Sequence, residues 1–169
     1  MVTATGLEAA RAVAAAVPDP ELPMVTVADL GILRDVSQDG GQLVVTITPT
    51  YSGCPAVREI AQDLRHRLTE AGFGPVTVRT TLSPAWTSDW ITEAGAAKLR
   101  AAGIAPPHRA PARRPGPVPL TLLTALPAVS CPHCGSADTT RTAPFSATAC
   151  KALYRCEACR EPFEYLKDI

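Results

Sequence analysis

Apolar side chains recur at helical spacing in two stretches of the chain. The first stripe predicts a helix over about residues 5–17, ended by Pro18, and consists of Leu7, Ala10, Val13, Ala14 and Val17. The second predicts a helix from Pro55 to about Gly72 and consists of Val57, Ile60, Ala61, Leu64, Leu68 and Ala71. A third helix is expected to begin at Thr87 or Ser88 and to end near Ala102.

Alternating, β-branched residues predict three strands in the same part of the chain. Residues 32–37 and 42–48 flank Gln38-Asp39-Gly40-Gly41, a sequence typical of a hairpin turn, and residues 76–82 form the third strand. Residues 25–30 are expected to form a short helical turn closed by Gly31. The order αββαβα predicts an α+β domain with two layers, in which helices pack on a three-stranded mixed sheet.

The composition changes between residues 105 and 127, which include seven prolines, three arginines and no acidic residue. This segment is predicted to be a semi-rigid linker. It separates a domain over residues 1–104 from a small domain over residues 128–169. The aliphatic residues between 118 and 126 predict that the later half of the linker packs on one of the two domains.

The small domain contains four cysteines in two CxxC knuckles that are 21 residues apart: Cys131, Cys134, Cys156 and Cys159. This pattern predicts a Cys₄ zinc ribbon, with short strands over residues 139–142, 152–155 and 162–166. A segment of this size cannot bury a sufficient core, so the metal would supply the missing stability. Iron is the alternative metal for four thiolates, whereas a thioredoxin-like site would need a βαβ context that is absent from this sequence.

Two further residues of the small domain are interpreted as non-ligands. His133 lies inside a knuckle and is expected to be exposed, and Cys150 is expected to be a buried strand residue. The segment from residue 131 to residue 169 carries five basic and five acidic residues. Ribbons that bind nucleic acid need a basic face, so a structural or protein-binding ribbon is the better interpretation.

Charge and hydropathy exclude several classes of function for the whole chain. The 169 residues include 16 basic and 16 acidic side chains, a balance that gives no support for binding nucleic acid or an anionic membrane. Glu8 and Arg11 interrupt the alanine-rich N-terminal segment, which argues against a signal peptide. Because no run of 18 apolar residues occurs either, we expect a soluble, cytoplasmic protein whose cysteines serve metal binding or reactivity.

Cys54 stands where the second strand turns into the second helix. We interpret it as the N-cap of that helix, with its sulfur near unpaired N–H groups and the positive end of the helix dipole. Such surroundings lower the pKa of a thiol and favour the thiolate, which binds metals and attacks electrophiles. A small buried hydrophobic residue is the alternative interpretation of a lone cysteine.

Several motifs of this sequence resemble those of a known family, the metal–sulfur cluster assembly domain of iron–sulfur assembly factors. The similarity spans about residues 7–107 and rests on Asp19-Pro20-Glu21-Leu22-Pro23, Asp29-Leu30-Gly31, Thr48-Pro49-Thr50 with Cys54-Pro55, and Pro84-Ala85-Trp86. The tail resembles the ribbon of the PaaD (also called PaaJ) family of bacterial phenylacetate degradation. That similarity rests on the first knuckle and on the segment from Thr148 to Cys156.

The resemblance implies a non-enzymatic accessory role in the phenylacetyl-CoA oxygenase (epoxidase) system, often described as an oxygenase subunit. It implies that Cys54 is the reactive thiol that holds iron or an iron–sulfur cluster transiently, with Asp19, Glu21 and Thr50 lining its cleft. The partners it implies are the iron–sulfur reductase and the other oxygenase subunits, and self-association of the chain is compatible with this role. The chain lacks a terminal cysteine found in many members of the family, because it ends in Leu166-Lys167-Asp168-Ile169.

Three functions are therefore compared. The first is maturation or maintenance of an iron–sulfur cluster, and the second is a stoichiometric structural role in the oxygenase complex. The third is thiol-dependent catalysis, which the sequence disfavours because it contains no catalytic triad, phosphate loop or nucleotide-binding signature.

Overall fold

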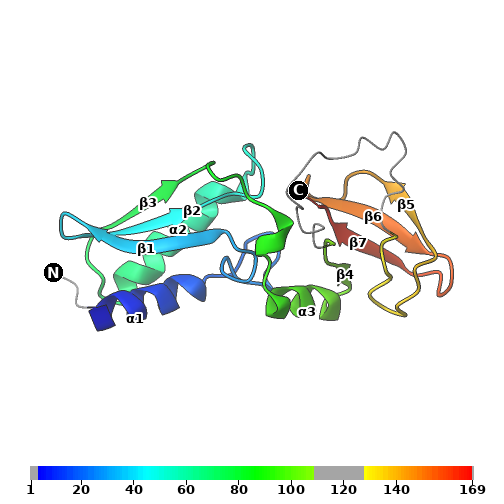
Figure 1. Ribbon diagram of the computed structural model, residues 1–169, viewed down its shortest axis with the longest axis horizontal. Coiled ribbons are helices and arrows are strands. Elements are labelled where there is room, and N and C mark those ends of the chain that lie inside the picture. The colour runs from blue at the N-terminus through cyan, green and yellow to red at the C-terminus, as the bar shows by residue number, and fades with distance from the viewer. Residues whose placement is uncertain (1–3, 109–127, 169) are drawn as a thin grey trace, which may run out of the picture. The chain divides into compact units, whose positions relative to one another are not determined.

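The computed structural model describes residues 4–108 and 128–168. The described residues form two compact units, residues 4–102 and residues 103–108 together with 128–168. Each unit contains its own sheet (Figure 1). The expected linker lies mostly outside the described residues, as does its apolar segment 118–126.

The first unit has the mixed three-stranded sheet that the sequence predicts. Strands β1 (Leu33–Asp39) and β2 (Gln42–Ile47) form an antiparallel hairpin, and β3 (Val76–Thr80) pairs with β2 in parallel. The sheet order is β1-β2-β3, so β3 is an edge strand (Figure 1). The hairpin turns at Gly40 and Gly41, whose φ angles of 56° and 87° are readily adopted by glycine.

Helices α1 (Ala4–Ala15) and α2 (Ala56–Glu70) pack on this sheet, as their apolar stripes predict. The buried residues of the unit come from the stripes and from the strands and include Ala10, Ala14, Val36, Val45, Ile47, Ile60, Leu64 and Leu68. Arg11 of α1 donates to Asp35 (2.7 Å) and to the backbone oxygen of Val36 (3.2 Å), and both acceptors belong to β1. These two hydrogen bonds hold helix α1 against the edge strand β1.

The third predicted helix is divided in two. A 3₁₀ turn, η1 (Ser88–Trp90), is capped by Thr87, and α3 (Glu93–Ala101) begins separately with Thr92 as its N-cap. The expectation of one continuous helix is wrong because Ile91 adopts an extended conformation (φ −65°, ψ 126°), which interrupts the helical backbone.

The segment Asp29-Leu30-Gly31 holds these later elements in place. The backbone oxygen of Asp29 accepts from the N–H of Thr92 (2.8 Å), and its carboxylate accepts from Nζ of Lys98 (2.6 Å). The backbone oxygen of Leu30 accepts from the indole N–H of Trp86 (2.9 Å). The two motifs around Asp29 and Trp86 therefore have a structural role, which is to tie η1 and α3 to the turn before β1.

Replacing Gly31 by alanine should destabilise the first unit by roughly 2–4 kcal/mol. The φ angle of Gly31 is 68°, and a Cβ there would lie 2.5 Å from Cβ of Trp90 and 2.6 Å from its backbone oxygen. Gly40→Ala is the matched control. Gly40 also has a positive φ, but the Cβ of an alanine there would have no other atom within 4 Å. It should cost only about 1 kcal/mol from backbone strain. Denaturant unfolding measures both, and equal losses would show that contact with Trp90 is unimportant.

The second unit is a four-stranded sheet with the order β4-β7-β6-β5 (Figure 1). Strands β5 (Thr139–Ala143), β6 (Lys151–Cys156) and β7 (Pro162–Leu166) form an antiparallel meander close to the predicted positions. The fourth strand, β4 (Ile104–Ala105), pairs in parallel with β7 and was not predicted. The first unit thus ends at residue 102 rather than at the expected 104, because Ile104 and Ala105 hydrogen-bond within the ribbon sheet.

Candidate metal centre and thiol site

The two CxxC knuckles have the same backbone geometry. The N–H of Gly135 donates to the oxygen of Cys131, and the N–H of Arg160 donates to the oxygen of Cys156, at 2.9 and 3.0 Å. The two donor residues follow their knuckles directly and have φ angles of 76° and 68°. Arg160 is the one described residue other than glycine with a positive φ. The knuckle turn therefore imposes a left-handed residue at this position even where the sequence supplies an arginine.

The four knuckle cysteines gather at one point. Their sulfur atoms all lie within 4.8 Å of one another, with 3.8 Å between Cys131 and Cys159 and 3.5 Å between Cys134 and Cys156. A tetrahedral zinc site with Zn–S bonds of about 2.3 Å requires sulfur atoms roughly 3.8 Å apart. The donor set and its spacing therefore fit a tetrahedral metal ion. Thiolates suit both zinc and iron, so the four cysteines could hold either metal.

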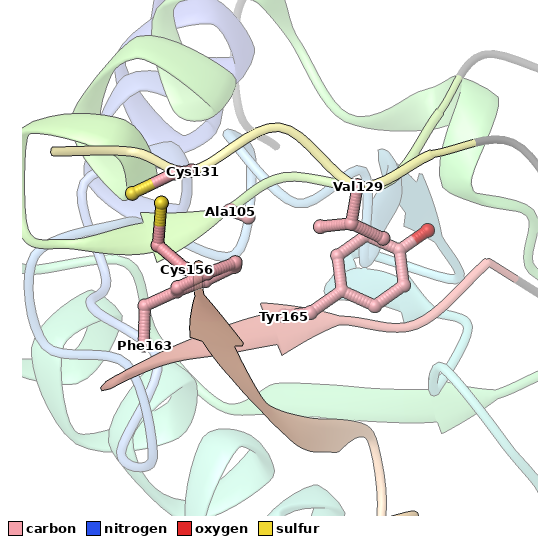
Figure 2. Close-up of a cluster of buried hydrophobic side chains, with 6 residues drawn as sticks. All are labelled: Ala105, Val129, Cys131, Cys156, Phe163 and Tyr165. Atoms are coloured by element: carbon pink, nitrogen blue, oxygen red, sulfur yellow. The ribbon is translucent and has the colours of Figure 1, made fainter. Parts of the chain in front are cut away.

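The metal site is built into the small core of the ribbon. Cys131 and Cys156 are buried together with Ala105, Val129, Phe163 and Tyr165. Figure 2 shows the sulfurs of Cys131 and Cys156 pointing toward each other at one end of this cluster. Phe163 stacks on Tyr154 with ring centroids 5.8 Å apart. Because the core is this small, holding its cysteine end together stabilises the whole unit.

One thiol of the site is poised to ionise. The backbone N–H of Cys159 donates to Sγ of Cys156 at 3.4 Å. This hydrogen bond, together with those from the Cys134 and Cys159 thiols and the backbone of Ala158, lowers the pKa of the Cys156 thiol to about 7 against the raising effect of burial. Metal binding requires the thiolate, so the knuckle backbone favours the form that binds.

His133 lies where the sequence placed it, whereas Cys150 is buried as expected but lies in the turn before β6 rather than in a strand. His133 is exposed. Cys150 is buried, with 7% of its surface exposed, directly before β6, and its sulfur lies 3.1 Å from the hydroxyl of Thr148. Cys150 does not belong to the group of four sulfurs. Lys151, next to it, is buried and forms an ion pair with Glu164 (2.7 Å).

Cys54 lies in the loop between β2 and α2 and is half-buried. It is not the N-cap of α2, and that expectation is wrong: the helix begins at Ala56, and Pro55 occupies the cap position with helical angles (φ −67°, ψ −27°). The backbone of Cys54 is fixed instead by turn hydrogen bonds, from its N–H to Tyr51 (3.2 Å) and from Val57 to its oxygen (3.4 Å). The thiol therefore stands one residue before the cap, at the start of the helix.

Asp19 has a buried carboxylate, and Glu21 lies beside it. Oδ1 of Asp19 accepts from the backbone N–H groups of Glu21 and Leu22, both at 2.9 Å. Burial nevertheless raises the pKa of the Asp19 carboxyl, and the charges of Glu21 and Glu59 raise it further, against the lowering effect of those two hydrogen bonds. Glu59 lies in the first turn of α2. The acidic loop and the start of α2 are therefore electrostatically coupled.

A series of backbone hydrogen bonds connects the Asp19 loop to the end of β2. Val27 donates to Val17 (2.9 Å), Ile32 donates to Val27 (2.9 Å), and Thr48 donates to Ile32 (2.9 Å). Thr50 and Cys54 follow Thr48 in the same loop. Asp19, Glu21, Thr50 and Cys54 thus belong to segments that meet at one end of the sheet, while direct contact is established only between Asp19 and Glu21.

Sequence reasoning missed two residues of this region. Glu59 was not singled out, although its place in the first turn of α2 is a favourable one for an acidic residue. Thr48 is buried, and its hydroxyl is the one buried side-chain polar atom of the described residues that has no hydrogen-bond partner. A pattern of residues in sequence gives no signal for such an atom, because its environment comes from distant segments.

Replacing Asp19 by asparagine should raise the melting temperature at pH 7. A carboxyl whose folded pKa is raised costs nothing below its unfolded pKa of 3.8, and it destabilises the fold increasingly as the pH rises through its folded pKa. The amide keeps the Oδ1 acceptor and removes the buried charge. The advantage of Asp19→Asn should therefore vanish below about pH 4. Melting curves from pH 3 to 8 test this with Asp63→Asn as the control, and a lower melting temperature at pH 7 would contradict it.

None of the helices among the described residues is long and apolar enough to cross a membrane.

Two family models match separate parts of the chain. The iron-sulfur cluster assembly protein model matches residues 7–79, and the PaaD zinc beta ribbon domain model matches residues 115–167. The crystal structure of a domain of unknown function, DUF59, from Bacillus anthracis matches with a TM-score of 0.51 and 29% identity, covering 57% of this chain and 97% of that chain. These matches confirm the expected fold of both parts.

Two curated relatives extend this result. A protein of Escherichia coli (strain K12) that is named as a subunit of the "Putative 1,2-phenylacetyl-CoA epoxidase" is 47% identical over 155 residues, covering 90% of this chain and 87% of the relative. The "Fe-S protein maturation auxiliary factor" of Porphyromonas gingivalis (strain ATCC BAA-308 / W83) is 38% identical over 78 residues, covering 44% of this chain and 72% of the relative.

The fold and the sites define a protein of the iron–sulfur assembly class that carries a zinc-ribbon-type domain with a cluster of four cysteines suited to a metal ion. The similarity to the epoxidase subunit of Escherichia coli runs over most of both chains. This chain therefore belongs to the PaaD family, which includes that epoxidase subunit.

Proposed function

We propose that this chain is an accessory factor of the phenylacetyl-CoA epoxidase system, which matures or maintains the iron–sulfur cluster of the reductase. The observation that carries the proposal is the union of two parts in one chain. An iron–sulfur assembly domain and a PaaD-type ribbon together account for most of the sequence. A relative of the first part is named as a maturation factor, and a relative of the whole chain is named as an epoxidase subunit.

In this proposal the two units have different tasks. Cys54 transiently holds iron or a cluster as cargo, and Asp19, Glu21 and Thr50 line the cleft around it. The support is that backbone hydrogen bonds connect the Asp19 loop to the end of β2, from which the loop with Thr50 and Cys54 leads to α2. Carboxylate and thiolate donors both bind iron. In the ribbon, Cys131, Cys134, Cys156 and Cys159 bind a structural zinc ion, and the unit serves to dock the partner subunits.

This function requires no turnover of a substrate by the chain itself. The oxygenase performs the oxidation, and the accessory factor restores the cluster through which the reductase supplies electrons. We therefore assign the chain a non-catalytic role. The partners in this assignment are the reductase and the other subunits of the epoxidase.

Deletion of the gene tests the proposal. The reductase purified from the deletion strain should contain substoichiometric iron and sulfide, and expression of this chain should restore both. The amount of reductase polypeptide should remain unchanged, and it can be quantified in the same preparation. A reductase with full cluster content in the deletion strain would refute a maturation role.

The name of the relative favours a second candidate function, a stoichiometric structural subunit of the epoxidase. The two functions differ in the amount of protein required. A structural subunit should copurify with the oxygenase subunits in a fixed ratio, and oxygenase activity should rise in proportion to it up to that ratio. A maturation factor should act at substoichiometric amounts and should be absent from the purified active complex.

A further inference from the structure

The two edges of the first sheet differ in what occupies them. The backbone of β1 is fastened to α1 through Arg11, which donates to the oxygen of Val36. Among the described residues, no strand pairs with the outer edge of β3. The N–H of Thr81 donates to Ile47 of β2 (2.9 Å). Since alternate residues of a strand direct their backbone groups to opposite edges, Val78 and Thr80 direct theirs outward.

A cleft runs beside this open edge, between α2 and β3. Its lining includes Val57, Ala61, Val78 and Thr80, together with two arginines of α2, Arg58 and Arg65. The lining contains no acidic residue. Both arginines are exposed, and neither forms an ion pair within the described ranges 4–108 and 128–168. The cleft thus combines an apolar floor, unpaired positive charge and a row of outward backbone groups.

We propose that this cleft binds an extended, acidic segment of a partner protein, which adds a strand to β3. Strand addition satisfies the outward N–H and C=O groups of Val78 and Thr80, and the groove between strand and helix receives alternate side chains. Apolar side chains of the segment rest on Val57 and Val78. Its carboxylates pair with Arg58 and Arg65, which fixes the charge that the partner must carry.

Charge favours this occupant over a second copy of the chain. Antiparallel pairing of two β3 edges about a twofold axis would place both α2 helices on the same face of the joined sheet. Arg58 and Arg65 of each copy would then approach those of the other, and juxtaposed like charges are unfavourable. The proposal is independent of what Cys54 carries, because the cleft does not include that residue.

A synthetic peptide tests the proposal on the full-length protein. The probe is a capped nine-residue peptide with valine and glutamate in turn at its odd-numbered positions and serine at the even-numbered ones, so that both residue types can face the cleft. The control peptide has lysine in place of glutamate. In a ¹⁵N NMR titration the acidic peptide should shift the amide signals of β3 and α2, including Val78 and Thr80. Equal binding of the lysine peptide, or shifts confined to other elements, would overturn the proposal. So would concentration-dependent dimerisation that protects the β3 amides.

Protein variants test the charge, and modified peptides test the strand. Arg58→Glu combined with Arg65→Glu should weaken acidic-peptide binding at least about tenfold, whereas Arg67→Glu on the same helix outside the cleft should change it less than about twofold. Two peptides, N-methylated on the odd-numbered or on the even-numbered residues, distinguish the two backbone edges of the segment. One should bind as the parent does and the other at least about tenfold more weakly. Equal affinities of the two methylated peptides would refute strand addition.

Discussion

Replacing Cys134 by serine is expected to release the metal from the ribbon and to unfold the ribbon unit, while residues 4–102 stay folded. Cys134 is exposed, so the substitution removes a metal ligand with little loss of packing. Structural zinc contributes about 10–16 kcal/mol of apparent binding free energy in small domains, more than this ribbon core can replace. Zinc content by elemental analysis and the ¹⁵N NMR spectrum of each unit measure the two effects.

Cys150→Ser is the matched control for this experiment. Cys150 lies in the same unit and is buried, but its sulfur is not among the four that gather. The variant should keep one metal ion per chain and lose only modest stability. Retention of the metal by Cys134→Ser would show that the four cysteines are not the ligand set. If the wild-type protein contained iron in place of zinc, the four-cysteine site would stand, but the assignment of zinc as its metal would be wrong.

The second large effect is expected at Cys54. Cys54→Ser should leave the fold and the zinc content unchanged and should abolish cluster loading of the reductase. Serine is a poor ligand for soft metals, so the cargo would lose its thiolate. Because Pro55 rather than Cys54 occupies the cap position, Cys54→Ala should behave like the serine variant and should not lose the stability of a helix cap. Iron and sulfide in the reductase measure the functional effect.

Alkylation provides a test that does not depend on the partner. Cys54 is half-buried and Cys150 is buried, so iodoacetamide at neutral pH should modify Cys54 first in the zinc-loaded protein. Mass spectrometry of tryptic peptides resolves the two sites. If Cys54→Ser retained full cluster loading, the thiolate role would be refuted, and the structural-subunit function would become the better assignment.

The sequence by itself determined most of the architecture of this protein. Local spacing predicts α1, α2 and the six longer strands, because their helical or alternating and β-branched patterns each suit one secondary structure. The two CxxC pairs likewise predict the cluster of four sulfurs, since the knuckle turn needs only adjacent residues and a left-handed position after it. Motifs with this much local information also carried the family resemblance.

Tertiary structure alone decided the features that depend on distant segments. Strand β4 has only two residues, too few for an alternating apolar pattern, and it forms because it pairs with β7. The break between η1 and α3 lies where Asp29 and Leu30 hold the chain, and the raised pKa of Asp19 arises from burial and from Glu59 on another element. The open edge of β3 is likewise visible only in the assembled sheet. Burial, strand pairing and charge proximity are long-range properties, so spacing along the chain cannot specify them.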